Sequence, residues 1–171
     1  YVALEAPLAE TDAMPSLASG GVAPIFEIDS RGRVRGQFRY PLEPIARQLP
    51  GRLADNGVSE ILAPKQDTFL VLERSGSQQG DGSFRFLSRL YCAWPAFRNA
   101  DRKTAIELRK RLVFDFMPAG VSDLANLEGM TFGPETEDGL GTLTLVSDND
   151  FRAERPSFVV ILSLQNSAGA R

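Results

Sequence analysis

The chain has 171 residues, 43% hydrophobic and 24% charged, so it is long enough to bury the core of one ordinary domain. Its 19 Lys and Arg against 22 Asp and Glu give a net charge of -3, which argues against general affinity for nucleic acid or an anionic membrane. The absence of histidine excludes Ser-His-Asp catalysis and histidine-ligated metal sites, and the single cysteine excludes an intrachain disulfide. Acid–base chemistry must therefore come from Asp, Glu, Lys, Tyr or metal-bound water.

Short runs of Val, Ile, Leu, Phe and Tyr, separated by Gly, Pro, Asp, Asn and Ser, predict an all-β chain. No apolar run reaches the roughly 20 residues that span a bilayer. The chain opens inside a strand-like run, YVALEAP, which indicates a piece of a longer protein. In chain order, we expect strands at Tyr1 to Glu5, Val22 to Ile28, Val34 to Tyr40, Val58 to Ala63, Thr68 to Glu73, Phe84 to Cys92, Leu108 to Phe116, Leu127 to Phe132, Thr142 to Ser147 and Ser157 to Leu164.

Little else in the sequence predicts regular structure. The segments Pro44 to Leu49 and Ser122 to Asn126 are each long enough for one helical turn. Residues 166–171 are small and polar, and we expect them to form a disordered tail. We expect residues 1–165 to form one domain.

Three apolar strands end on an acidic residue at a similar offset: VALE at Glu5, LVLE at Glu73 and LVSD at Asp148. Each is followed by a loop and a further apolar strand, so the unit is four antiparallel strands in series, as in a propeller blade. We therefore predict a partial β-propeller of about three four-stranded blades. One blade, about Val58 to Phe116, is complete, and the chain is a fragment of a larger closed ring.

The motifs YVALEAPL, NGVSEILAP with FLVLER, KRLVFDF, and NLEGMTFGP with TLTLVSDNDF resemble those of the phytase-like propeller family, "esterase-like activity of phytase". The resemblance covers nearly the whole chain and corresponds to the C-terminal half of that domain. It implies a role in phosphoester or ester hydrolysis, export to the periplasm or cell exterior, and a missing N-terminal half as partner.

The same resemblance marks eight residues. We expect Glu73, Arg74 and Glu128 to be catalytic, and Glu5, Glu60, Asp148, Asn149 and Asp150 to hold Ca²⁺ or Mg²⁺, with no organic cofactor. Repeated carboxylates at one rim of a propeller repel one another, by about 4 kcal/mol at 4 Å and an effective dielectric near 20, so a hard cation there is plausible chemistry. The alternative is structural: acidic residues at strand ends often cap turns or pair with Arg and Lys.

Cationic residues offer one further candidate. The segment Arg98 to Arg111 is basic and either attracts a phosphorylated ligand or forms a solvated loop before an outer strand.

Three functions remain open from the sequence. The first is a metal-assisted hydrolase of phosphate or carboxylate esters. The second is a non-catalytic propeller that binds a ligand or protein partner, with calcium only structural. The third is a calcium-dependent, lactonase-like propeller.

Overall fold

The computed structural model describes residues 1–97, 103–117 and 126–165, and these residues contain ten strands and no helix. The chain divides into two compact units, Tyr1–Asp123 and Leu124–Arg171. The all-β class is confirmed, whereas an arrangement of separate blades stays a prediction. Among the described residues, none forms a helix able to cross a bilayer.

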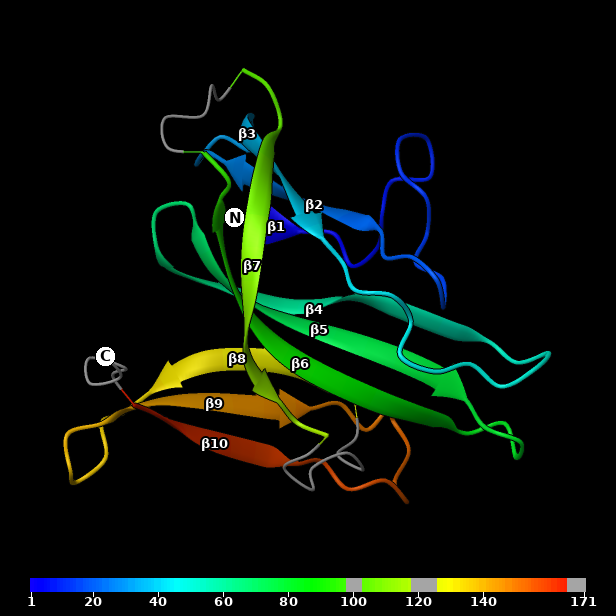
Figure 1. The fold of residues 1–171 in the computed structure, drawn as a ribbon. Coiled ribbons are helices and arrows are strands. Elements are labelled where there is room, and N and C mark those ends of the chain that lie inside the picture. The colour runs from blue at the N-terminus through cyan, green and yellow to red at the C-terminus, as the bar shows by residue number, and fades with distance from the viewer. Residues whose placement is uncertain (98–102, 118–125, 166–171) are drawn as a thin grey trace, which may run out of the picture. The chain divides into compact units, whose positions relative to one another are not determined.

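The first unit is a seven-stranded sheet in the order β1-β2-β3-β7-β6-β5-β4 (Figure 1). Its strands are β1 (Val2–Ala3), β2 (Val22–Ile28), β3 (Val34–Pro41), β4 (Ala54–Lys65), β5 (Thr68–Gln78), β6 (Phe84–Pro95) and β7 (Ile106–Asp115). Neighbours pair antiparallel except β3 and β7, which are joined by a short parallel ladder. The predicted complete blade corresponds to the antiparallel series β4 to β7.

The sheet nearly closes on itself at β1 and β4. The Val58 amide donates a hydrogen bond to the Glu5 carbonyl at 2.9 Å. A Cβ at Gly57 would lie 2.7 Å from that same carbonyl oxygen, closer than real Cβ contacts come. Glycine is therefore needed for the chain after β1 to approach β4.

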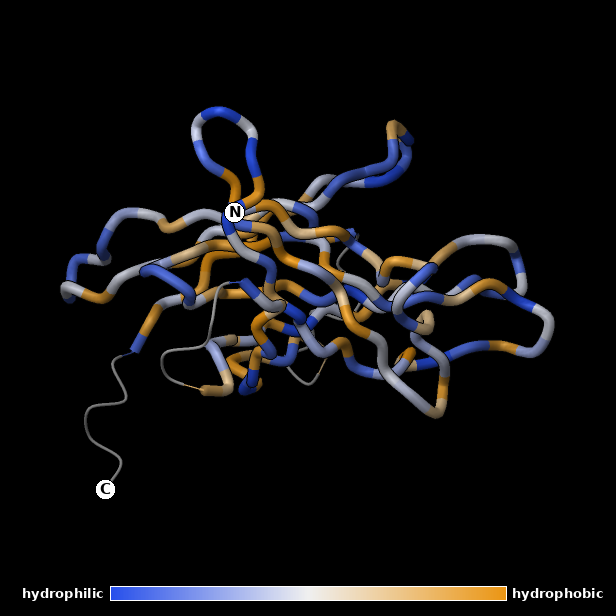
Figure 2. Tube along the Cα trace, turned by 90° about the horizontal axis from the view of Figure 1, so that it is seen from above, coloured by the Kyte–Doolittle hydropathy of each residue, from blue (hydrophilic) through white to orange (hydrophobic). Residues whose placement is uncertain are grey.

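The core lies between β1–β3 and β4–β7. Phe38 of β3 and Phe69 of β5 meet edge to face, with ring centroids 5.3 Å apart, and Tyr1 packs against both. Figure 2 shows the hydrophobic stretches along the strands and mostly hydrophilic connecting loops. The buried residues of this cluster are Ala23, Ile25, Phe38, Tyr40, Leu42, Val58, Phe69, Val71, Ala93, Ile106 and Leu108.

The second unit is a three-stranded antiparallel sheet of β8 (Leu127–Gly133), β9 (Gly141–Ser147) and β10 (Val159–Leu164) in the order β10-β9-β8. Leu143 and Leu145 of β9 are fully buried, and their alternation with half-buried Thr144 matches the two-residue period of a strand. The residues predicted as a tail, 166–171, lie outside the described part of the chain.

Two expectations differ in detail from the structure, and a third lies almost wholly outside the described residues. Strand β5 runs to Gln78, five residues beyond the predicted end at Glu73, because pairing with β4 and β6 holds the poor strand formers Ser75, Gly76 and Ser77. The predicted turn of helix at Pro44 to Leu49 is wrong, since this segment is irregular. The second predicted turn, Ser122 to Asn126, falls almost wholly outside the described residues.

Candidate functional site

One face of the β4–β7 sheet changes character along its length. Successive strand residues point to opposite faces, so the odd-numbered residues of β5 share one side, which we call the core face. It carries Phe69 and Val71 at the apolar end, then Glu73, then Ser75 and Ser77. On β6 the facing residues are Ala93, Tyr91, Arg89, Leu87 and Arg85 in the same order.

Glu73 is the centre of a buried polar network on this face. Only 3% of its side chain is exposed. Its Oε1 accepts hydrogen bonds from the Tyr40 hydroxyl, at 2.7 Å, and from the Lys110 ammonium. Its Oε2 accepts from the Asn56 amide at 3.0 Å and from the Glu43 backbone amide at 3.1 Å. Four donors match the four lone-pair sites of a carboxylate, so the buried charge is fully solvated by the protein.

Lys110 balances the negative charges of this network. Its ammonium pairs with Glu73 and also with the Glu43 carboxylate at 3.0 Å. It lies 4.1 Å from the ring centroid of Tyr91 and 5.0 Å from that of Tyr40, where the negative ring faces favour a cation. Burial, followed by the negative charge of Glu73, raises the pKa of both tyrosines well above the usual value.

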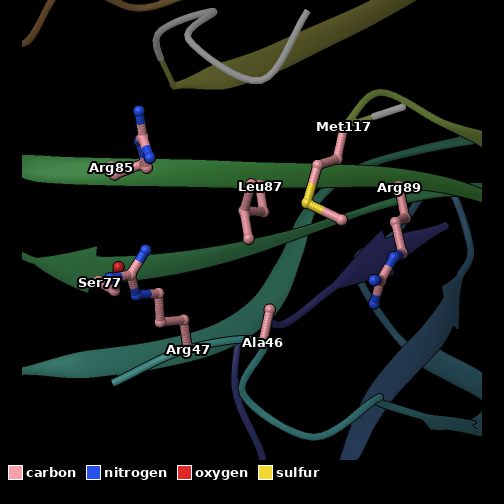
Figure 3. Close-up of a pocket in the computed structure, with 7 residues that line it drawn as sticks. All are labelled: Ala46, Arg47, Ser77, Arg85, Leu87, Arg89 and Met117. Carbon is pink, nitrogen blue, oxygen red and sulfur yellow. The ribbon is translucent and has the colours of Figure 1, made fainter. Parts of the chain in front are cut away.

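Beside this network the core face opens into a cavity of about 310 Å³ (Figure 3). Among the residues that the structure describes, its lining includes three arginines and no carboxylate, namely Ala46, Arg47, Ser77, Arg85, Leu87, Arg89 and Met117. Figure 3 shows that Arg47 extends toward Ser77 at one end of the cavity, and that Arg89 lies at the other end. Leu87 and Met117 lie between these two ends. One of these arginines, Arg89, is paired with Asp115 at 3.0 Å, so the cationic groups of the lining do not contribute equally.

Both walls of the cavity are held by hydrogen bonds. The Ala46 amide donates to the Ser75 hydroxyl at 3.0 Å, which fixes the segment before Arg47 over β5. On the other side, Asp115 accepts hydrogen bonds from Arg89 Nε and from the Met117 amide, each at 3.0 Å. Hydrogen bonds within the first unit therefore hold the residues that line the cavity in place.

The predicted catalytic residues are divided between the two faces of one sheet and the second unit. Glu73 lies on the core face, whereas Arg74 points to the other face, where it pairs with Glu5 at 2.5 Å and lies 5.2 Å from the Phe86 ring centroid. Glu128 belongs to the second unit, where it accepts a hydrogen bond from Asn126 at 2.7 Å.

The predicted metal ligands are engaged by protein donors. Glu60 accepts a hydrogen bond from the Ile61 amide, and Glu5 pairs with Arg74. Asp148 and Asn149 accept from the amides two residues ahead of them, as in ordinary turns. Asp150 pairs with Arg155 at 2.5 Å and accepts a hydrogen bond from Asn126.

No group of three or more Asp, Glu, His or Cys able to hold an ion is found among the residues that the structure describes. Binding of Ca²⁺ or Mg²⁺ by Glu5, Glu60, Asp148, Asn149 and Asp150 stays a prediction, and we derive no chemical step through a metal.

The strand pairing does not match the predicted equivalence of Glu73 and Asp148. A β-bulge follows the pair Val58 and Glu73 in the first unit, and a bulge follows the pair Leu127 and Ser147 in the second. Ser147, rather than Asp148, thus takes the place of Glu73. A shift of one residue turns a side chain to the opposite face of its strand.

Sequence reasoning missed the cationic residues of the site. The alternation Arg85, Leu87, Arg89 within a predicted strand was the available signal, because it places both arginines on one face. On β7, Lys110 is two residues after Leu108 and four after Ile106, so it lies on the same strand face as these two buried residues. Of the basic segment Arg98 to Arg111, Lys110 turns inward and binds a carboxylate of the protein itself.

We expect Lys110→Met to lower the free energy of unfolding by about 3–5 kcal/mol, because it leaves the Glu73 carboxylate buried without its cation. Urea denaturation measures the change, with the exposed Lys65→Met as matched control, expected within about 0.5 kcal/mol of the parent. Adding Glu73→Gln to Lys110→Met should recover part of the loss. A loss below about 1 kcal/mol for Lys110→Met would mean that the pair contributes no more than a surface ion pair.

The three tyrosines should titrate unequally. Phenolate absorbance should show the partly exposed Tyr1 ionising first, while Tyr40 and Tyr91 ionise only as the protein unfolds. Because their folded pKa values are raised, the unfolded chain releases protons first above about pH 10, and stability falls as the pH rises further. Reversible titration of all three near that pH, with the fold intact, would contradict the buried network.

Comparison with known proteins gives one match. The model of the Phytase-like family, described as "Esterase-like activity of phytase", matches residues 1–151. No curated protein and no solved structure gives a significant match. The matched range includes both Glu73 and every residue that lines the arginine cavity. The chain therefore belongs to the phytase-like family.

Proposed function

We propose that this chain binds an anionic ester in the arginine-lined cavity and takes part in its hydrolysis. The observation that carries the proposal is the cavity itself: Arg47, Arg85 and Arg89 line it, and none of its described lining residues is a carboxylate. Arginine donates several fixed N–H groups to phosphate or carboxylate oxygens, and such charge-assisted hydrogen bonds are about twice as strong as neutral ones. The family's description, "Esterase-like activity of phytase", supports the further proposal that the bound ester is hydrolysed.

In this proposal the arginines stabilise the charge that develops as water attacks the phosphorus or carbonyl carbon. The new bond to the water oxygen forms while the ester bond to the alcohol oxygen breaks, and the proton lost by water ends on the leaving alcohol. Fixed cations aimed at the reacting oxygens lower the barrier for such a step.

Glu73 has a different role in this proposal. Its four hydrogen bonds occupy the lone pairs that a general base would need, so it acts by holding the residues around the cavity. Glu43, whose amide and carboxylate both belong to the network, lies four residues before Arg47.

Binding without hydrolysis is the second candidate. It is favoured by the engagement of Glu5, Glu73 and Asp150 with cations of the protein, since ion-paired carboxylates are poor nucleophiles and bases. In that case the chain recognises an anion and a catalytic group, if any, comes from elsewhere.

Arg47→Met tests the proposal. Hydrolysis of p-nitrophenyl phosphate and of the mono-p-nitrophenyl ester of succinate, which keeps one free carboxylate, by the purified chain is measured beside direct binding of phenyl phosphate. Losing a charge-assisted hydrogen bond should cost about 1.5–3 kcal/mol, a fall of roughly 10- to 100-fold in kcat/KM or affinity. Arg31→Met, on the exposed turn between β2 and β3, is the matched control and should match the parent.

The outcomes separate the candidates. Binding that depends on Arg47 without turnover of either ester would favour the non-catalytic function. Activity and binding that are the same in Arg47→Met as in Arg31→Met would remove the cavity from the function.

A further inference from the structure

We infer that the cavity selects a compact ester with one anionic group and an apolar body, rather than a polyanionic sugar phosphate. This inference rests on the proposed function, because it assigns the ligand class to the same cavity. It follows from how charge and apolar surface are distributed between the cavity's two ends.

The two ends differ in net charge. At one end Arg47 extends toward Ser77, and within the described part of the chain no carboxylate pairs with Arg47 (Figure 3). At the other end Arg89 is neutralised by Asp115, 3.0 Å from its Nε. Figure 3 shows the Arg85 guanidinium pointing away from Ala46. A single anionic group therefore finds its strongest partner at the Arg47 end.

The space between the ends is apolar. Leu87 lies on the core face between Arg85 and Arg89, and in Figure 3 the side chains of Leu87 and Met117 lie between Arg47 and Arg89. A second phosphate placed there would lose its water without gaining a donor, which costs several kcal/mol for a charged group. An aromatic ring or short alkyl group would instead bury apolar surface.

The volume limits the size of that body. A cavity of about 310 Å³ is at the lower end of the range of pockets that hold small ligands. It suits a phosphate or carboxylate head with one ring, and is small for a lipid chain.

The test compares the affinities of inorganic phosphate, phenyl phosphate, octyl phosphate and fructose bisphosphate for the purified chain. Phenyl phosphate should bind at least about tenfold more tightly than inorganic phosphate. Burying part of the phenyl ring, equal in apolar area to about two methylene groups, is enough to give this ratio of affinities. Octyl phosphate should bind no more tightly than phenyl phosphate.

Leu87→Asn should abolish the preference for phenyl phosphate and leave the affinity for inorganic phosphate unchanged. Because Leu87 is half-buried, Met117→Gln, at a 45% exposed position, serves as a second variant should Leu87→Asn fail to fold.

Fructose bisphosphate binding at least as tightly as phenyl phosphate, or much tighter binding of octyl phosphate, would overturn the compact, apolar ligand. The proposed function would survive either result as long as Arg47→Met weakens binding. If no probe shows binding that depends on Arg47, the cavity is not a ligand site and both proposals fail.

Discussion

The buried pair of Glu73 and Lys110 is the interaction on which the arrangement of the first unit depends. It joins β5 to β7, and the other donors to Glu73 bring in β3 through Tyr40 and β4 through Asn56. The Glu43 amide completes the set and ties down the irregular segment after β3. A buried carboxylate is tolerated only when such partners satisfy it, so the network fixes one relative placement of these strands.

This network separates two environments on one sheet face. Toward Phe69 and Val71 the face is covered by β1–β3 and forms a dry core. Toward Leu87 and Arg89 the segment around Ala46 and Arg47 lies over this face, and a cavity remains. The same alternation of strand side chains thus supplies both the stability of the unit and its candidate binding surface. Stability and recognition are linked through Glu73.

The strands were predictable because their signals are local, namely apolar residues alternating between turn residues. This pattern located all ten strands, although the prediction for β5 ended before its Ser-Gly-Ser segment. The roles of the acidic residues were not, because they depend on partners far away in sequence. Glu73 meets Lys110 across 37 positions, and Glu5 meets Arg74 across 69. The recurrence of acids at strand ends indicated importance, whereas their pairing required the fold. Arg47 lies in an irregular segment with no sequence pattern, so only the structure places it beside β6.

The most direct measurement is native-state hydrogen exchange at the backbone amides of Glu43 and Ala46. Both lie in a segment without regular structure, yet they donate to Glu73 and Ser75 on the core face. We expect both amides to be protected to a degree comparable to the β5 amides, and we expect the Glu43 amide to lose this protection in Glu73→Gln. Exchange at both amides as fast as in the exposed turn at Arg31 would contradict a network that holds the cavity wall in place.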